Sequence, residues 1–184
     1  MYNEELYHYG VKGMRWGHRK KYYNEDGSLN KVGQARQTYK NAKKEFASAR
    51  INEFRTTINP IKTFGVEGIK RTEKVQKRTN KAYADMVTAN ARYKASKAKT
   101  AEKAEKAEFK TYKNAMMTTG LRGSANDTSS GGRSTAIYNE MKIKKGKAYA
   151  DRVEKRMEKE LVAGLAASAI ATGAVIVGSL LENS

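Results

Sequence analysis

The sequence predicts an all-α protein built from extended basic helices. The chain of 184 residues contains one proline, the strongest interior helix breaker, and is rich in alanine, lysine, glutamate and arginine, which favour helices. Hydrophobic residues make up 39% of the chain, and the large aliphatic ones are concentrated in residues 161–181, so little is left for a compact core. We therefore expect a helical hairpin or bundle, with an irregular motif at the N-terminus and a hydrophobic helix of transmembrane length at the C-terminus.

Residues 1–32 are predicted to form an irregular docking motif rather than a helix. Four glycines, Gly10, Gly13, Gly17 and Gly27, interrupt this segment, and Asp26-Gly27 is typical of a tight turn. The segment contains no long apolar run, so we expect no cleaved secretory signal.

Residues 33–117 are predicted to form a basic helical body. In its first helix, apolar residues recur at helical spacing from Tyr39 to Ala49, and Pro60 follows the end of the helix. Its second helix, residues 69–117, is strongly charged, and its apolar stripe is too thin to be buried alone. We expect that stripe to pack either against the first helix in a hairpin or against other copies of the chain in a bundle.

The remaining chain is predicted to contain a flexible linker and two helices. Residues 118–135 are rich in glycine, serine and threonine and lack periodicity, which is typical of a linker. Residues 136–160 are predicted to be a basic helix, in which KAYAD at 147–151 repeats KAYAD at 81–85, through duplication or through composition alone. Residues 161–181 are predicted to be the hydrophobic helix, and residues 182–184 a short tail.

The hydrophobic helix has the length of one membrane crossing. Its 21 residues carry no charge and would span about 31 Å, against about 30 Å for the hydrocarbon core of a bilayer. Small and hydroxyl side chains fall within an arc of about 80°, which predicts close helix–helix association. The candidate association residues are Gly164, Ser168, Thr172 and Ser179. The alternative is a buried helix in a soluble assembly.

The charge of the chain favours polyanionic partners. The formal net charge is +18, and residues 60–117 carry 15 Lys and Arg against 6 acids. Such a field attracts nucleic acid or anionic lipid, whereas the plain alternative is a solvated surface that keeps the protein soluble. The candidate polyanion-binding residues are Lys94, Lys97, Lys99, Lys103, Lys106, Lys110 and Lys113.

Motifs for catalysis or metal binding are missing from the sequence. There is no cysteine, and His8 and His18 stand ten residues apart without a fixed carboxylate partner, so we expect no metal site. The sequence has no phosphate loop, nucleophile elbow or carboxylate pair in an apolar setting. We therefore expect neither an enzyme nor a cofactor.

The N-terminal segment combines aromatic, cationic and glycine residues in the manner of a docking peptide. Large contact surfaces, positive charge and close backbone approach are available within a few residues. The candidate partner-docking residues are His8, Tyr9, Gly10, Val11, Lys12, Gly13, Met14, Arg15, Trp16 and Gly17. Their order, followed by YNEDGSL at residues 23–29 and by Gly33, resembles the signature HYGVKGMKWGVRR…DGSL of phage and prophage structural, virion-associated proteins of Gram-positive bacteria. Arg15 and His18 stand where that signature has Lys and Val.

The resemblance implies a phage origin and a shared tag read by a capsid, portal or tail protein. Together with the charge and the hydrophobic helix, it suggests a non-enzymatic virion protein that contacts DNA or membrane and enters a bilayer during genome delivery. Such a protein would reside in the bacterial cytoplasm during assembly, in the virion, and in the host membrane on delivery, as a homo-oligomer. The alternatives are a tail-anchored phage or prophage membrane protein, acting as a lysis accessory or exclusion factor, and a simple nucleic-acid-binding accessory.

Overall fold

A computed structural model of the chain confirms the all-α fold. It describes residues 22–24, 26–58, 65–123 and 130–182, with side chains described for the same residues except 130 and 166–182. The helices are α2 (Lys31–Thr57), α4 (Gly65–Ser96), α5 (Ala101–Thr119), α6 (Ser130–Lys145) and α7 (Lys147–Glu182). Apart from an isolated antiparallel bridge between Tyr23 and Leu29, these residues contain no β-structure.

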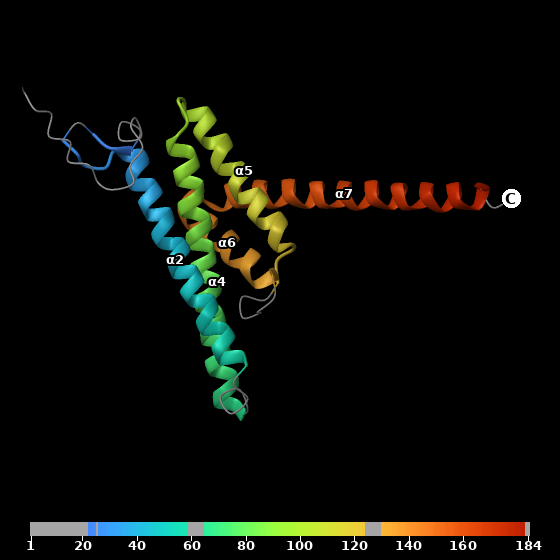
Figure 1. The fold of residues 1–184 in the computed structure, drawn as a ribbon, viewed down its shortest axis with the longest axis horizontal. Helices are drawn as coiled ribbons and strands as arrows, with labels where there is room; N and C mark the ends of the chain where they lie inside the picture. The colour runs from blue at the N-terminus through green and yellow to red at the C-terminus, as the bar shows by residue number, and fades with distance from the viewer. Residues whose placement is uncertain (1–21, 25, 59–64, 124–129, 183–184) are drawn as a thin grey trace, which may run out of the picture.

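Helices α2 and α4 form a long antiparallel hairpin within one chain (Figure 1). Three contacts between the helices set their register. They are Tyr39 stacked on Tyr93 with ring centroids 6.1 Å apart, Phe46 against Tyr83 at 5.0 Å, and a 3.3 Å hydrogen bond from the Thr79 hydroxyl to the Ala49 carbonyl. The thin apolar stripe of α4 is therefore partly covered by α2. This is the hairpin that the sequence predicted as one of two alternatives.

The helix predicted over residues 69–117 is wrong as a single element, because the chain reverses after Ser96. A new helix, α5, begins at Ala101 and packs back against α4. Thr100 is its N-cap, and its hydroxyl accepts a hydrogen bond from the Lys103 backbone N–H at 3.3 Å. This side chain satisfies one of the amide groups that a helix start leaves unpaired, so the new start is stabilised locally.

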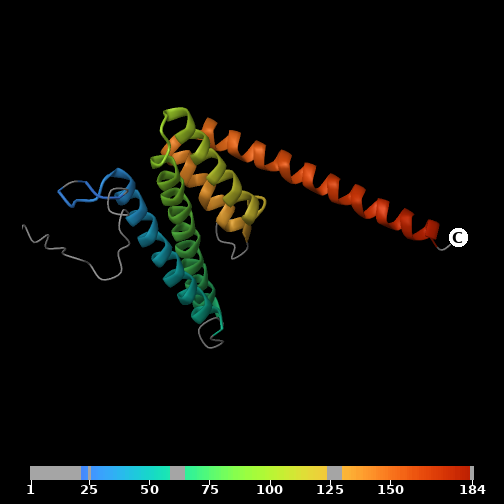
Figure 2. The same cartoon turned by 45° about the horizontal axis from the view of Figure 1, so that its top comes forward.

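The boundaries predicted for the C-terminal third also differ from the structure. Helix α6 begins at Ser130, inside the predicted linker, and Gly146 divides the predicted helix 136–160 in two. Gly146 has φ +90°, and its N–H donates to the Lys142 carbonyl at 3.1 Å, which is the geometry of a glycine helix stop. Helix α7 then continues past residue 160 without a break (Figure 2).

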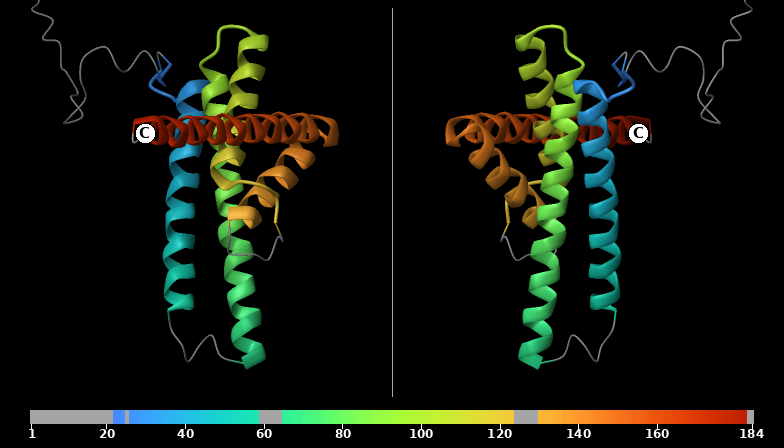
Figure 3. Two further views of the ribbon diagram at one scale, coloured as in Figure 1. Left: turned by 90° about the vertical axis from the view of Figure 1, so that its right-hand side faces the viewer. Right: turned by 90° about the vertical axis from the view of Figure 1, so that its left-hand side faces the viewer.

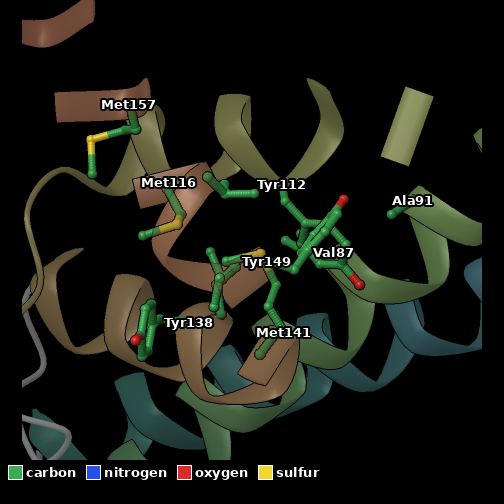
Figure 4. Packing of buried hydrophobic residues seen from close by; sticks show 12 residues of the cluster. Val87, Ala91, Tyr112, Met116, Tyr138, Met141, Tyr149 and Met157 are labelled. Carbon is green, nitrogen blue, oxygen red and sulfur yellow. The ribbon is translucent and has the colours of Figure 1, made fainter. Parts of the chain in front are cut away.

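The hydrophobic core lies where the second half of α4 meets α5, α6 and the start of α7 (Figure 4). All four helices contribute buried side chains to this core, and most of the larger ones are tyrosine, methionine, valine or isoleucine. The core members include Val87, Ala91, Tyr112, Met116, Ile137, Tyr138, Met141, Tyr149, Val153 and Met157. The start of α4 lies beside α2 and away from the core, so the described residues form a packed end and a two-helix end (Figure 3).

Arg133 on α6 links the packed end to the hairpin. Its guanidinium lies 5.9 Å from the centroid of the Phe46 ring and 5.8 Å from that of Tyr83, and 3.9 Å from the Glu53 carboxylate. One side chain thus contacts both helices of the hairpin.

Helix α7 leaves the bundle after its first turns and projects away from it (Figure 1). Val162 and Leu165, the last large apolar residues whose side chains are described, are exposed. Among the residues that the structure describes, no helix is both long and apolar enough to cross a membrane. The side chains of 166–182, which make up most of the predicted hydrophobic helix, lie outside that description.

Candidate polyanion-binding surface

The cations of α5, α6 and α7 are largely neutralised by acids of the same three helices. Between residues 101 and 165, seven of the eight acidic side chains described form ion pairs. These pairs are Lys106–Glu102, Lys113–Glu160, Arg122–Glu154, Lys144–Glu140, Lys145–Glu108, Lys147–Asp151, Arg152–Glu105 and Arg156–Glu160. Four of these eight pairs lie within one helix at i,i+4 spacing, and the other four link separate segments of the bundle.

The cations of the α2–α4 hairpin are different, because none of them forms an ion pair with another described residue. Helix α2 carries seven Lys and Arg and α4 carries eight, against five acids on the two helices together. On the part of α4 from Lys70 to Lys81, six exposed cations fall within an arc of about 120°. These six residues, named here the α4 stripe, are Lys70, Arg71, Lys74, Lys77, Arg78 and Lys81. Exposed and unpaired charge of one sign along a helix is what a polyanion recognises.

The outward face of α2 extends this surface. Lys40, Lys43, Lys44 and Arg50 are exposed and fall within an arc of about 120° that runs from one flank of α2 to the side facing away from α4. The hairpin therefore carries unpaired positive charge on both of its helices.

The seven lysines predicted from the sequence lie at the other end of α4 and along α5. Lys106 and Lys113 are held in ion pairs, and the Lys97 ammonium lies 3.8 Å from the centroid of the Tyr93 ring. The other four are exposed and have no ion pair within the described residues; they are Lys94, Lys99, Lys103 and Lys110. The α4 stripe is not among the lysines predicted from the sequence, although its cations recur every three or four residues.

An aromatic and cationic cluster closes the hairpin at its N-terminal end. The Arg36 guanidinium lies 4.4 Å from the centroid of the Tyr22 ring, and Tyr93 stacks on Tyr39. A hydrogen bond to Tyr93 raises the pKa of the Tyr22 phenol, whereas the neighbouring Lys97 lowers that of Tyr93. These contacts hold the end of the N-terminal segment against α2 and α4.

A tight turn lies at the DGSL sequence of residues 26–29. The Asp26 carboxylate accepts a hydrogen bond from the Ser28 N–H at 2.8 Å, and Gly27 has φ +82°, so the turn predicted at Asp26-Gly27 is confirmed. The Ser28 hydrogen bonds lower the pKa of Asp26. A Cβ atom at Gly33 would stand 2.2 Å from the Tyr22 carbonyl oxygen, so glycine lets the turn lie on the start of α2.

Several predicted site residues lie outside the described part of the chain. The partner-docking motif from His8 to Gly17 is among them, as are the side chains of Ser168, Thr172 and Ser179. Gly164 is described, is exposed, and has nothing within 4 Å of the position a Cβ atom would take. That face of α7 is open to another helix.

The two copies of KAYAD occupy contrasting electrostatic environments. Ala84 and Ala150 are both buried in the core. Burial raises the pKa of Asp85, with Glu140 adding to the effect. In the second copy, the Lys147 ammonium donates to Asp151 at 2.7 Å, and that bond together with one from the Tyr138 hydroxyl lowers the pKa of Asp151.

A groove of about 360 Å³ lies between α5 and the start of α7, lined by Ala101, Ala104, Glu105, Glu108, Lys145 and Tyr149. Both of its carboxylates are ion-paired, Glu108 with Lys145 and Glu105 with Arg152. Burial raises the pKa of the Tyr149 phenol. Among the described residues, no group of three or more His, Asp or Glu could hold a metal ion.

Comparison with known proteins concerns only the N-terminal motif. Residues 1–22 match a family of unknown function (DUF7211), a segment that includes the motif from His8 to Gly17. No curated protein and no solved structure matches the chain. The matched segment is 22 of the 184 residues and ends before α2 begins.

Proposed function

We propose that the protein is a non-enzymatic, virion-associated bacteriophage protein whose α2–α4 hairpin binds DNA without sequence preference. The observation that carries this proposal is the unpaired positive charge of α2 and α4, beside the paired charge of α5, α6 and α7. Binding to DNA is driven by the release of condensed counterions, to which exposed, unpaired Lys and Arg contribute most. The phage origin rests on the N-terminal signature.

The other parts of the chain have matching roles in this proposal. The motif from His8 to Gly17 docks the protein on a capsid, portal or tail protein during assembly in the bacterial cytoplasm. The hydrophobic segment 161–181 enters the host membrane on delivery, and copies associate through a seam that begins at Gly164. The open surface around Gly164 supports this last role, because small residues allow helix backbones to approach closely.

DNA binding at several salt concentrations tests the role of the hairpin. The variant has Lys70, Lys74, Lys77 and Lys81 changed to Gln. The matched control loses the same charge at Lys106, Lys144, Lys145 and Lys147, which are ion-paired. We expect the slope of log K against log salt to fall by up to about 3 to 4 in the hairpin variant and by much less in the control. Equal losses in the two variants would show that only net charge matters.

Mass spectrometry of purified particles tests the virion assignment. The protein should be present in virions, whereas a tail-anchored membrane protein acting on the host envelope would be found in infected-cell membranes and be missing from particles. In the same experiment, a Trp16→Ala chain should be packaged less, because a buried aromatic anchor is typically worth about 2 kcal/mol or more.

Reconstitution of the full chain in vesicles tests the C-terminal helix. Gly164→Leu combined with Ser168→Leu adds aliphatic surface, so it should strengthen insertion, and it blocks close approach of helices, so it should weaken self-association. If both properties rise together, the seam is wrong. If deleting residues 161–181 changes neither, the membrane role of this segment fails.

A further inference from the structure

The free end of the α2–α4 hairpin exposes five large apolar side chains. Ile51, Phe54, Ile58, Val66 and Ile69 are 53%, 65%, 60%, 68% and 57% exposed. They belong to the last two turns of α2 and its cap, and to the first two turns of α4; we call this region the hairpin tip. The tip lies at the opposite end of α4 from the core, so α5, α6 and α7 leave it uncovered (Figure 3).

Four of these five side chains point away from the contact between the two helices. On α2, Ile51, Phe54 and Ile58 lie about 140° to 200° around the helix from Ala49, which is buried against α4. On α4, Val66 lies about 160° from the buried Gly68. The apolar surface is therefore distributed around the tip rather than gathered in a single flat patch.

Cations border this apolar surface on both helices. Arg50 and Arg55 lie on either side of the apolar arc of α2, and Lys70 and Arg71 follow the apolar turn of α4. All four are exposed and form no ion pair with a described residue. Apolar side chains flanked by Lys and Arg are the pattern of segments that enter the interface of an anionic membrane.

We propose that the hairpin tip inserts into an anionic lipid bilayer, with Phe54 and its apolar neighbours among the acyl chains and the bordering cations at the lipid phosphates. The apolar side chains are distributed around the tip, and a bilayer would cover them on all sides. The surface of one partner protein would cover only one side of the tip. DNA phosphates would satisfy the cations but would leave the apolar side chains in water. The site is separate from the C-terminal helix and does not depend on DNA binding by the hairpin.

A local fluorescence reporter in the full chain tests the proposal even if the C-terminal helix also binds vesicles. Trp16 is the single tryptophan, so Trp16→Phe gives a silent background. Phe54→Trp places the reporter at the tip, and Ile143→Trp is the control, because Ile143 is 79% exposed on α6, outside the tip. Vesicles rich in phosphatidylglycerol, vesicles of phosphatidylcholine alone, and the same lipids with brominated acyl chains serve as probes.

The Phe54→Trp emission should shift to shorter wavelength on phosphatidylglycerol vesicles and be quenched by brominated chains, with little response from Ile143→Trp. Adding Ile58→Ser and Ile69→Ser should weaken that response about tenfold or more, because each removes apolar surface that the membrane would bury. DNA affinity should stay the same, which separates this proposal from DNA binding. An equal response of both reporters, an equal response on neutral vesicles, or a blue shift produced by protein concentration or DNA alone would overturn it.

Discussion

The guanidinium of Arg133 lies 3.9 Å from the carboxylate of Glu53, and among the described residues this is the ion pair that joins the α2–α4 hairpin to the rest of the bundle. Their side chains are 22% and 16% exposed, so both are largely removed from water. Phe46 and Tyr83 lie beside the same guanidinium, whose Nε has no hydrogen-bond partner among the described atoms. The contact thus combines a largely buried charge pair with two aromatic faces.

Arg133→Ala should lower the free energy of unfolding by about 1 to 3 kcal/mol, because it removes the ring contacts and leaves Glu53 without its cation. Arg152→Ala is a matched control: Arg152 also pairs with a carboxylate and lies over a tyrosine ring, but its pair with Glu105 is about two thirds exposed. That variant should change stability by about 0.5 kcal/mol or less. Denaturant titration measures both, and equal effects would remove the special role of Arg133.

Gly33→Ala and Gly164→Ala should change stability in opposite directions. At Gly33 a Cβ atom would collide with the Tyr22 carbonyl oxygen, so the turn must move and the hydrogen bond from the Asn30 N–H to that oxygen, 2.9 Å long, should weaken. At Gly164 a Cβ atom meets open space, so alanine should stabilise the helix by up to about 1 kcal/mol. Amide hydrogen exchange at Asn30 and denaturant titration check the pair. Faster exchange at Asn30 is expected only for Gly33→Ala.

Local signals in the sequence predict more of the fold than the helical periodicity alone. Composition and spacing predict the helices, and a hairpin as one of two alternatives, but periodicity alone does not reveal a helix that ends and restarts. The signals for those breaks are Thr100, a side chain that caps the next helix, and Gly146, which follows two lysines as a helix stop. The start of α6 inside a Gly- and Ser-rich run depends on packing: the Gly131 carbonyl accepts from the Gly123 N–H at 3.0 Å.

The binding surface is harder to predict, because charge along a sequence does not reveal which charges are paired. Lys113 and Glu160 are 47 positions apart and meet only because α5 and α7 pack together. Conversely, Glu67 and Glu73 stand four residues before Arg71 and Lys77, a spacing that favours pairing, yet neither pair forms within the described residues. Tertiary contacts therefore decide which Lys and Arg remain available to a polyanion.

Asp85→Asn and Asp151→Asn should have opposite effects at neutral pH, although both residues end a KAYAD sequence. The pKa of Asp85 is raised above its ordinary 3.8, so its ionised form weakens the fold and Asp85→Asn should be stabilising at pH 7. The pKa of Asp151 is lowered, so its contribution is present above pH 3.8 and is lost as the pH falls through the folded-state pKa. Asp151→Asn should therefore be destabilising at pH 7.

Denaturant titrations at pH 7 and pH 3 check this pair. At pH 3 the difference in the free energy of unfolding between Asp151→Asn and the unmodified chain should be smaller than at pH 7. The stability gained by Asp85→Asn should also be smaller at pH 3. If both substitutions destabilise the protein equally at pH 7, the contrast between the two environments is wrong.

Lys110→Gln and Lys113→Gln, three residues apart on α5, should separate DNA binding from stability. Lys110 is exposed and has no ion pair with a described residue, so Lys110→Gln should weaken DNA binding and lower the salt slope by about 0.9 at most, with little change in the denaturation midpoint. Lys113 is held by Glu160 across the α5–α7 contact, with 17% of its side chain exposed. Lys113→Gln should therefore lower the midpoint and leave the salt slope nearly unchanged.

Arg156 also bonds Glu160, at 2.9 Å, so the carboxylate keeps one partner and the chain should still fold. Reversed results, with Lys113 affecting DNA and Lys110 affecting stability, would mean that the ion pair does not hold in solution.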